Sequence, residues 1–546
     1  MKHLFSGIAL GAALTLPGAA MACGGLFCDN TQPVNQAAER ILFAHDGETL
    51  HMHVRITYQG PPTEFAWLLP TSPEVEVGVS SEQLFTRLDQ QFAPRFTLRT
   101  EIDPRCQDDF ARGGAAGADA SVQNAPPSPV EDEAGGVQVL SREPVGAFDT
   151  AILRAETIDD LRAWLDENGY QIPEATDATL APYVEMGAAF VAVKLLPDRD
   201  AGDVSPLRLS FPGDRPAIPI VPTSVAADPD MGIIVHVIGQ SRAIPVNYRH
   251  VIINEAAIDW QGGGQNYADV VSQAADEANG KAFATDFAGR GGVMLRVMGQ
   301  RQLDAVRAAE TSRDIVEALN LWDLFWNPDA DLQRLVSTGI LLPDDISLQD
   351  FLNCPDCYDD RGIEIDGAAL ADALEREYDA PREQLNALFE QNPYLTRLYS
   401  TLSPAEMTLD PEFAFNPDLG EVPNNRVAVQ RVGCDFEGNL RFGRAVIETP
   451  SGIRFRLQDG VNPNVIRRQA GETVRGMGVP GAQVIQRTLT AGPAEVQSDR
   501  TPDIEEMNPI ALNDGGCACD AAEGSAPTAF GLLALLGLVG LRRRRS

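Results

Sequence analysis

Two apolar, uncharged segments, one near each end, confine the folded body of this chain to the residues between them. The first, Leu4–Leu16, follows Lys2 and precedes the small-residue site Ala20-Met21-Ala22, an order typical of a secretory signal peptide. The second, residues 526–541, would form a helix about 24 Å long, slightly shorter than a hydrocarbon core of roughly 30 Å. We therefore predict a signal peptide at 1–22 and a C-terminal transmembrane helix at 526–541.

Four arginines, Arg542, Arg543, Arg544 and Arg545, follow the apolar segment and would stay in the cytoplasm, which leaves the body outside the inner membrane. Residues 517–546 join a "CAC" motif, a short apolar helix and this arginine cluster. That order resembles the myxococcal-type C-terminal sorting signal (MYXO-CTERM). The resemblance implies that a sorting protease removes the helix and that Cys517, or alternatively Cys519, is lipidated. Two alternatives are a tail anchor that is never cut and acylation of Cys23 after signal cleavage.

The composition is that of an acidic globular protein. Hydrophobic residues make up 44% and charged residues 22% of the chain, and the formal net charge is -35. Such a charge repels phosphate backbones, so we predict no nucleic-acid partner. The expected partners are the membrane, signal peptidase and a sorting protease, and the expected location is the cell envelope or surface of a Gram-negative bacterium. No cofactor is predicted, and the surface ligand is unknown.

Six of the eight cysteines remain when those of the "CAC" motif are set aside, and an even number in an exported chain predicts disulfides. Local pairs close most readily, so we favour Cys23–Cys28 and Cys354–Cys357, which leaves Cys106–Cys434 by elimination. "CPDC" could instead be a redox pair, but a helical or loop segment precedes it, where a redox motif follows a strand.

Alternating strand patterns, capped helices and turn-rich stretches predict an α+β fold. "AERILFAH" and "ETLHMHVRITY" alternate as strands, and "TIDDLRAWLDENGY" is a helix capped by Thr157. The expected regions are a β-rich domain (23–112), a disordered linker (113–136), a mixed α/β domain (137–300), a helical region (301–410), a β-rich C-terminal region (411–498), an acidic stalk (499–516) and the sorting signal (517–546).

Several ordered stretches of the body resemble a bacterial family of unknown function, domain family 2330. They include "CGGLFC", "PVNQAAERILFA", "FAWLLP", "LRAWLDENGY", "LAPYVEMGAAFVAVKL", "PLRLSF" and "LTRLYSTLSPAEMTLDPEFAFNPDL". They run from about Cys23 to Leu419. The resemblance implies an exported, often membrane-anchored bacterial protein, and it brings no catalytic residues.

Two motifs could carry chemistry. "HMH" places His51 and His53 on one face of a strand, and Glu39 or Glu48 could complete a zinc site, although solvent-facing histidines are the simpler interpretation. "GQSRA", residues 239–243, approaches a nucleophile elbow, but Pro245 blocks the helix that an elbow requires.

Three loops offer weaker signals. "GGGQN" before Tyr267 could bind an anion at a helix start, with a flexible turn as the default. "NPDADL" and "CYDDRGIEIDG" could bind calcium, with solvated acidic turns as the stronger interpretation. We therefore expect a non-enzymatic structural, adhesion or ligand-binding protein. The alternative is a secreted metal-assisted hydrolase using His51 and His53.

Overall fold

The structure, a computed structural model, describes much of the chain between residues 26 and 509. The described ranges are 26–27, 36–55, 66–104, 106, 136–170, 173–196, 204–225, 227–321, 327–343, 345–363, 365–435, 439–467 and 478–509. The predicted signal peptide, the linker up to residue 135, Cys23, Cys28, and the sorting signal with its helix 526–541 all lie outside these ranges. Within them, no helix is both long and apolar enough to cross a bilayer.

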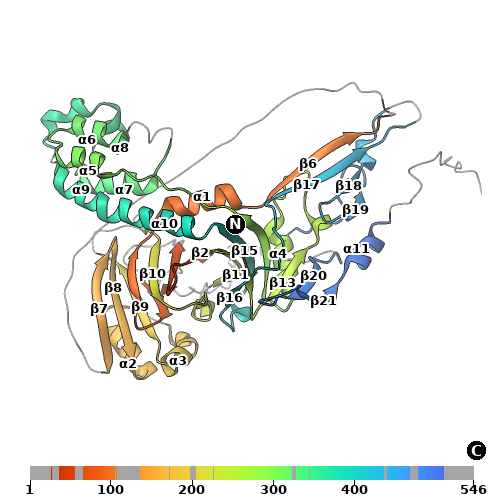
Figure 1. Cartoon of the computed structure of the whole chain (residues 1–546), viewed down its shortest axis with the longest axis horizontal. Helices are drawn as coiled ribbons and strands as arrows, with labels where there is room; N and C mark the ends of the chain where they lie inside the picture. The colour runs from red at the N-terminus through yellow and green to blue at the C-terminus, as the bar shows by residue number, and fades with distance from the viewer. Residues whose placement is uncertain are drawn as a thin grey trace, which may run out of the picture. The chain divides into compact units, whose positions relative to one another are not determined.

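A ten-stranded mixed sheet is the centre of the fold (Figure 1), with the order β21-β20-β13-β14-β15-β11-β2-β3-β10-β5. Two neighbouring pairs, β11 with β2 and β13 with β14, are parallel, and the remaining pairs are antiparallel. The strands are β2 (Gln36–His45), β3 (Thr49–Arg55), β5 (Glu76–Val79), β10 (Leu207–Pro212), β11 (Ala227–Gly239), β13 (Arg249–Ile253), β14 (Ala282–Arg290), β15 (Tyr394–Leu402), β20 (Ala482–Arg487) and β21 (Glu495–Asp499).

A second sheet covers one face of the first. Its five strands are β1 (Leu26–Phe27), β4 (Ala66–Thr71), β9 (Ala189–Leu195), β8 (Phe148–Ala155) and β7 (Val137–Val145), in that spatial order. Phe43 and Val235 of the large sheet join Phe148 and Val191 of the small one in a shared apolar core. Helices α2 (Ile158–Glu167) and α3 (Asp177–Glu185) cover the outer side of the small sheet through a separate cluster around Trp164.

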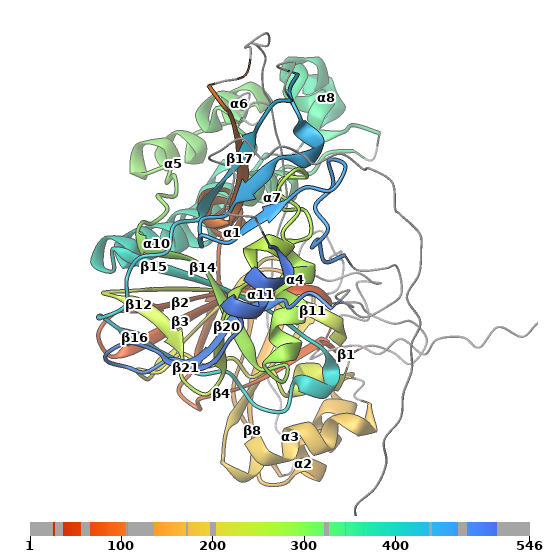
Figure 2. The ribbon, with the colours of Figure 1, turned by 90° about the vertical axis from the view of Figure 1, so that its right-hand side faces the viewer.

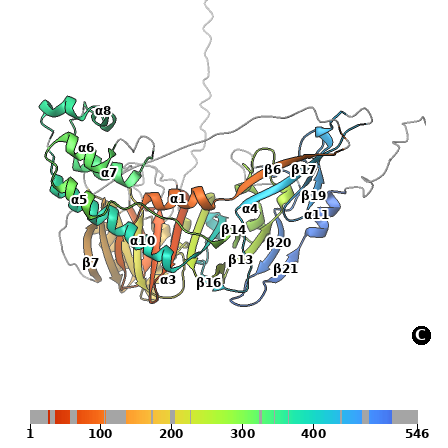
Figure 3. The same cartoon turned by 45° about the horizontal axis from the view of Figure 1, so that its top comes forward.

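Helices cover the opposite face of the large sheet. Helices α1 (Glu82–Phe92) and α10 (Ala380–Gln391) pack on it through Phe85 and Leu388, and they lie close together across the strands (Figure 3). Helix α4 (Tyr267–Glu277) packs on the same face further along (Figure 2). A four-stranded sheet, β19 (Arg454–Arg456), β18 (Val446–Glu448), β17 (Asn425–Val432) and β6 (Arg95–Ile102), shares the α4 core.

The remaining elements are a helical cluster and a short ribbon. Helices α5 (Gln300–Arg307), α6 (Ser312–Leu319), α7 (Ala330–Gly339), α8 (Leu348–Asn353) and α9 (Gly367–Leu374) surround their own core. Strands β12 (Arg242–Pro245) and β16 (Phe413–Asn416) pair with each other. The α+β prediction is therefore correct.

The sequential domain boundaries are wrong, because strands distant in sequence pair with one another. The ten-stranded sheet takes strands from regions 23–112, 137–300, 301–410 and 411–498, and β6 pairs in parallel with β17. The described residues up to Asn508 form one compact unit. The structure also corrects two local assignments. β15 is a central strand inside the predicted helical region, and α1 is a helix inside the predicted β-rich domain.

The predicted acidic stalk begins too early. Residues 499–507 end β21 and form α11 (Thr501–Met507), whose Ile504 is 1% exposed and joins the α4 core. The fold therefore extends to about residue 508, and residues 510–516 lie outside the described ranges.

Two disulfides link described residues. Cys106 is bonded to Cys434, which ties the end of β6 to the end of β17, and Cys354 is bonded to Cys357 after α8. These are the two pairings expected for these four cysteines. "CPDC" follows a helix, which does not favour the redox-pair alternative.

The acids of "NPDADL" form a buried ionic network, which corrects their interpretation as a solvated turn. Arg382 of α10 is 1% exposed and donates to both carboxylate oxygens of Asp329, at 2.8 and 2.9 Å, and to Asp331 at 2.6 Å. Ser81, before α1, also donates to Asp331 at 2.6 Å. Burial acts to raise the pKa of Asp331, but the neighbouring arginines and hydrogen bonds outweigh it and hold that pKa below its ordinary value. The network joins α1, α7 and α10.

Replacing Asp331→Asn should destabilise the fold, because it leaves the buried Arg382 charge with one carboxylate fewer. Removing one partner of a buried ion pair costs about 3–5 kcal/mol. Chemical denaturation of the variant should show a loss of this order. The matched change Asp356→Asn removes an exposed partner of Arg313 and should leave the unfolding free energy nearly unchanged. Equal effects from the two variants would contradict the buried role of Asp331.

Candidate functional site

The two histidines of the predicted pair are buried, and the described residues bring no third metal ligand to them. His51 and His53 are 4% and 1% exposed, so they do not face solvent, and their Nδ1 atoms lie 2.8 and 2.7 Å from the hydroxyls of Ser210 and Ser80. Burial, followed by the charge of Arg208, lowers the pKa of His53 well below its ordinary value, which keeps the ring neutral.

The carboxylates proposed to complete the zinc site lie elsewhere. Leu42 and Ala44 of β2 lie opposite His53 and His51, so these two residues point to the same face as the histidines. Successive residues of a strand alternate between faces, and Glu39 therefore points to the opposite face of the sheet. Glu48 is exposed in the β2–β3 turn. No group of three potential metal ligands occurs among the residues that the structure describes.

The other weak motifs have structural roles. In "GQSRA", β12 begins at Arg242, so a strand follows Ser241 where an elbow needs a helix. Within "CYDDRGIEIDG", Asp366 caps α9 by accepting a hydrogen bond from the Ala369 amide at 2.9 Å.

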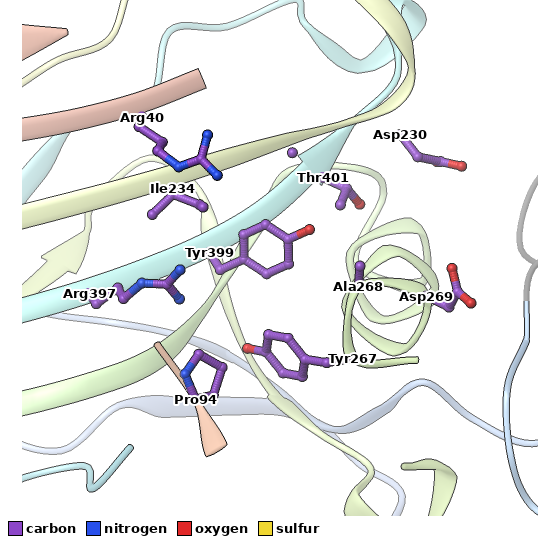
Figure 4. Close-up of a pocket in the computed structure, with 11 residues that line it drawn as sticks. Arg40, Pro94, Asp230, Ile234, Tyr267, Ala268, Asp269, Arg397, Tyr399 and Thr401 are labelled. Atoms are coloured by element: carbon purple, nitrogen blue, oxygen red, sulfur yellow. The ribbon is translucent and has the colours of Figure 1, made fainter. Parts of the chain in front are cut away.

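A cavity of about 490 Å³ lies on the helix-covered face of the large sheet. Its floor is formed by β2, β11 and β15, one wall by the first turn of α4, and another by Pro94 after α1. The register explains the floor, since Arg40 pairs with Ile234, and Ile234 with Tyr399, so all three point to one face. Figure 4 shows these side chains around the cavity.

A buried ion pair supports the floor. Asp286 is 0% exposed and pairs with Arg397, which is 5% exposed. The register of β14 and β15 shifts between Thr285 and Phe287, so Asp286 is the extra residue of a β-bulge. The bulge turns the carboxylate towards Arg397 and the hydroxyl of Tyr267, which donates to it. Burial raises the pKa of Asp286, although Arg397 and Tyr267 act in the opposite direction.

The glycine-rich loop positions the tyrosine wall through close packing and hydrogen bonds. Gly264 has a φ of 79°, and a Cβ there would lie 2.3 Å from the ring of Phe96, so glycine is required. The Asn266 side chain donates to the carbonyls of Ala257 and Ile466 at 2.8 and 2.7 Å. Tyr267 is thereby held against Tyr399, with ring centroids 5.7 Å apart and stacked at 28°.

Two sets of polar atoms, the terminal nitrogens of Arg40 and the hydroxyl of Thr401, line the cavity without a hydrogen-bond partner among the described residues. Arg40 donates from Nε to Asp89 of α1 at 3.0 Å, while its terminal nitrogens make no hydrogen bond to any described residue and point towards the cavity (Figure 4). Thr401 is 3% exposed, and its hydroxyl has no hydrogen-bond partner within the described part of the chain. A buried hydroxyl without a partner, such as that of Thr401, calls for a ligand or an ordered water, and the half-buried guanidinium of Arg40 lies beside it.

The far side of the cavity is acidic. Asp230, at a φ of 56° near the start of β11, and Asp269, in the first turn of α4, both line it. Asp276 interacts electrostatically with Asp230. Its pKa is raised to about 7, first by burial and then by the charges of Glu406 and Asp230.

A second cavity of about 390 Å³, lined by Tyr183 and Asp410, is a weaker candidate. The Asp410 carboxylate already accepts from the Tyr183 hydroxyl at 2.6 Å and from the Val221 amide at 3.1 Å.

The cavity of about 490 Å³ beside Arg40, called the Arg40 cavity from here on, was not predicted from the sequence. Arg40 appears in "AERILFAH" as a polar residue of an alternating strand, and that alternation was the available signal. Arg397, Tyr399 and Thr401 alternate in "LTRLYSTL", but the surrounding region was predicted to be helical.

The burial of Glu39 predicts how the stability of the fold depends on pH. It is 4% exposed, Oε2 has no hydrogen-bond partner in the described residues, and burial raises its pKa from 4.5 to about 7. Because the pKa of Glu39 is higher in the folded than in the unfolded state, the contribution of protonated Glu39 to stability is complete below pH 4.5. That contribution is lost as the pH rises through 7. Glu39→Gln should therefore be more stable than wild type at pH 8 by up to about 3 kcal/mol, and equal at pH 4. Denaturation at both pH values, with exposed Glu48→Gln as control, checks this. A destabilised Gln variant at pH 8 would contradict it.

Comparison with known proteins gives a family but no activity. A family described as "Uncharacterized protein conserved in bacteria (DUF2330)" matches residues 17–312. No curated protein matches the chain. Among solved structures, the crystal structure of baculovirus P35 is similar at 13% identity over 38% of this chain, with a TM-score of 0.22. This chain covers 66% of that protein, just under two thirds of its length, and so low a score supports no argument. The family match spans more than half of the sequence, and the chain belongs to this bacterial family of uncharacterised proteins.

Proposed function

We propose that this protein is an exported, C-terminally anchored envelope protein of a Gram-negative bacterium, and that its body binds a small ligand in the Arg40 cavity. One observation carries the binding role: the cavity presents the terminal nitrogens of Arg40 and the hydroxyl of Thr401, for which the described residues supply no hydrogen-bond partner. A pocket of 300–1,000 Å³ with a few convergent polar groups is the usual form of a small-molecule site.

The lining favours binding over catalysis. The described lining residues offer two guanidinium groups, the carboxylates of Asp230 and Asp269, a threonine hydroxyl and tyrosine rings, and no serine, cysteine or histidine is among them. Burial, and then the charge of Asp286, raise the pKa of Tyr267 well above its ordinary range, so this phenol keeps its proton. The buried and hydrogen-bonded His51 and His53 do not favour the metal-assisted hydrolase, and we do not retain it.

The disulfides support export. Cys106–Cys434 and Cys354–Cys357 are bridges of the kind that persist in oxidising compartments such as the periplasm and the cell surface. In this proposal signal peptidase removes residues 1–22, the segment 526–541 enters the inner membrane, and a sorting protease cuts the tail. Lipid on Cys517 or Cys519 then anchors the protein.

Lipidation is tested by feeding cells a labelled fatty acid and isolating the protein. Wild type should carry the label, and Cys517→Ala combined with Cys519→Ala should abolish it, because both candidate thiols are gone. Cys23→Ala serves as the control and should keep the label. Label persisting in the double variant would move the anchor to Cys23 or elsewhere.

Ligand binding is tested by native mass spectrometry of the full chain extracted from its own envelope. Wild type should carry a small-molecule mass increment. Ala268→Trp should lose it, because Ala268 is an exposed residue of α4 that lines the cavity and a larger side chain would fill the space. Ala305→Trp, at an exposed position of α5 outside the cavity, should retain it. An increment that survives in Ala268→Trp, or its absence from wild type, would contradict the proposal.

A further inference from the structure

The Arg40 cavity offers one open guanidinium edge. Arg40 donates from Nε to Asp89 at 3.0 Å, and this bond orients a side chain that is 24% exposed. Its two terminal nitrogens make no hydrogen bond within the described part of the chain and are turned to the cavity (Figure 4). The outer edge of a planar guanidinium matches the two oxygens of a carboxylate.

The second arginine of the lining is already occupied. One terminal nitrogen of Arg397 donates to Asp286, and the other lies 3.5 Å from the second carboxylate oxygen of Asp89. Asp89 is therefore shared between two arginines and reaches Arg40 through Nε alone. Among the described lining residues, the cavity thus has a place for one anionic group, at the terminal nitrogens of Arg40.

Other nearby carboxylates leave this edge open. Glu82 of α1 lies within electrostatic reach of Arg40, and it is ion-paired with Arg55 at 2.5 Å. Asp230 and Asp269 line the far side of the cavity, and their carboxylates are turned away from Arg40 (Figure 4). The guanidinium edge is therefore available to a ligand.

A second polar group lies on the floor at a fixed offset from Arg40. The register pairs Arg40 with Ile234 and Ile234 with Tyr399, and it places Thr401 two residues further along β15, opposite Gly232. Strand spacings put the backbones of Arg40 and Thr401 about 12 Å apart. Gly232 lines the cavity without a side chain, so the floor is open beside the buried, unpartnered hydroxyl of Thr401. A ligand that contacts both groups needs several atoms between its carboxylate and its second polar group.

The surface between these two polar groups is aromatic and apolar. The rings of Tyr399 and Tyr267 are stacked with centroids 5.7 Å apart, and the Tyr267 hydroxyl is bonded to Asp286. Pro94 and Ala268 add apolar wall surface. Aromatic rings prefer offset-stacked or edge-to-face contact with one another, so a flat ring fits between the two polar groups.

We propose that the Arg40 cavity binds a small aromatic carboxylate that bears a hydroxyl on the far side of its ring, of the hydroxybenzoate or hydroxycinnamate class. The carboxylate bonds to the terminal nitrogens of Arg40, the ring lies against Tyr399, and the hydroxyl bonds to Thr401. A phosphate ester fits less well, because it carries nearly two negative charges at pH 7 and meets a single open guanidinium edge. This inference rests on the proposed binding function and adds the chemical class of the ligand.

The test is calorimetric titration of the full chain in detergent with meta- and para-hydroxybenzoate and the corresponding hydroxycinnamates. At least one should bind. Its amide, which lacks the negative charge, should bind about 10-fold more weakly or worse, because a hydrogen bond to a charged group is lost. Its parent acid without the hydroxyl should bind about 3- to 10-fold more weakly. Phenyl phosphate should bind more weakly than the best acid.

Variants assign each ligand group to its residue. Arg40→Gln should remove the preference for the acid over its amide. Thr401→Val, which loses no hydrogen bond to a described residue, should remove only the preference for the hydroxylated acid over its parent. Arg99→Gln, at an exposed position of β6, is the control and should bind as wild type. Circular dichroism establishes that each variant is folded, and Thr401→Val keeps the test decisive if Arg40→Gln is not.

The outcomes separate this inference from the proposed function. Amides that bind wild type as tightly as the acids, or a phenyl phosphate that binds more tightly, would overturn the carboxylate class while ligand binding stands. A hydroxyl preference that survives in Thr401→Val would overturn the assigned orientation. If no panel member binds but native mass spectrometry finds a cavity ligand, the ligand class is wrong. Absence of both signals overturns both proposals.

Discussion

The buried pair of Asp286 and Arg397 is the interaction on which the candidate site depends. A carboxylate and a guanidinium removed from water are costly unless they meet, and here the β14 bulge brings them together. The same carboxylate accepts the Tyr267 hydroxyl, so one charged group ties β14, β15 and α4 together. It therefore supports both strand β15 of the floor and the α4 wall of the cavity.

The pairing of Arg397 with Asp286 also explains why Arg40 is the arginine that can bind a ligand. Arg397 is occupied by Asp286, whereas Arg40 is steadied through Nε alone by Asp89 of α1. Two arginines on neighbouring parts of one sheet face thus have different roles, one structural and one turned to the cavity. The five-stranded sheet on the other face buries Ile41, Phe43 and Val235 of β2 and β11, which leaves Arg40 and Ile234 on the helix-covered side.

The sequence predicted local structure better than long-range pairing. Alternation located β2 and β3, and the Thr157 cap located α2, because these signals are contained in a few adjacent residues. β15 was missed because "YLTRLYSTL" has few β-branched apolar residues and follows a long helical stretch. Asp331 was taken for a solvated acid because its partner Arg382 lies 51 residues away. The cavity joins residues as distant in sequence as Arg40 and Thr401, so no local pattern could reveal it.

An experimental density map of the protein isolated from its own envelope tests the central claim most directly. The account predicts a small molecule in the cavity, in hydrogen-bond contact with the terminal nitrogens of Arg40 and the hydroxyl of Thr401. A map in which a protein side chain occupies those nitrogens, or in which only water fills the cavity, would contradict it.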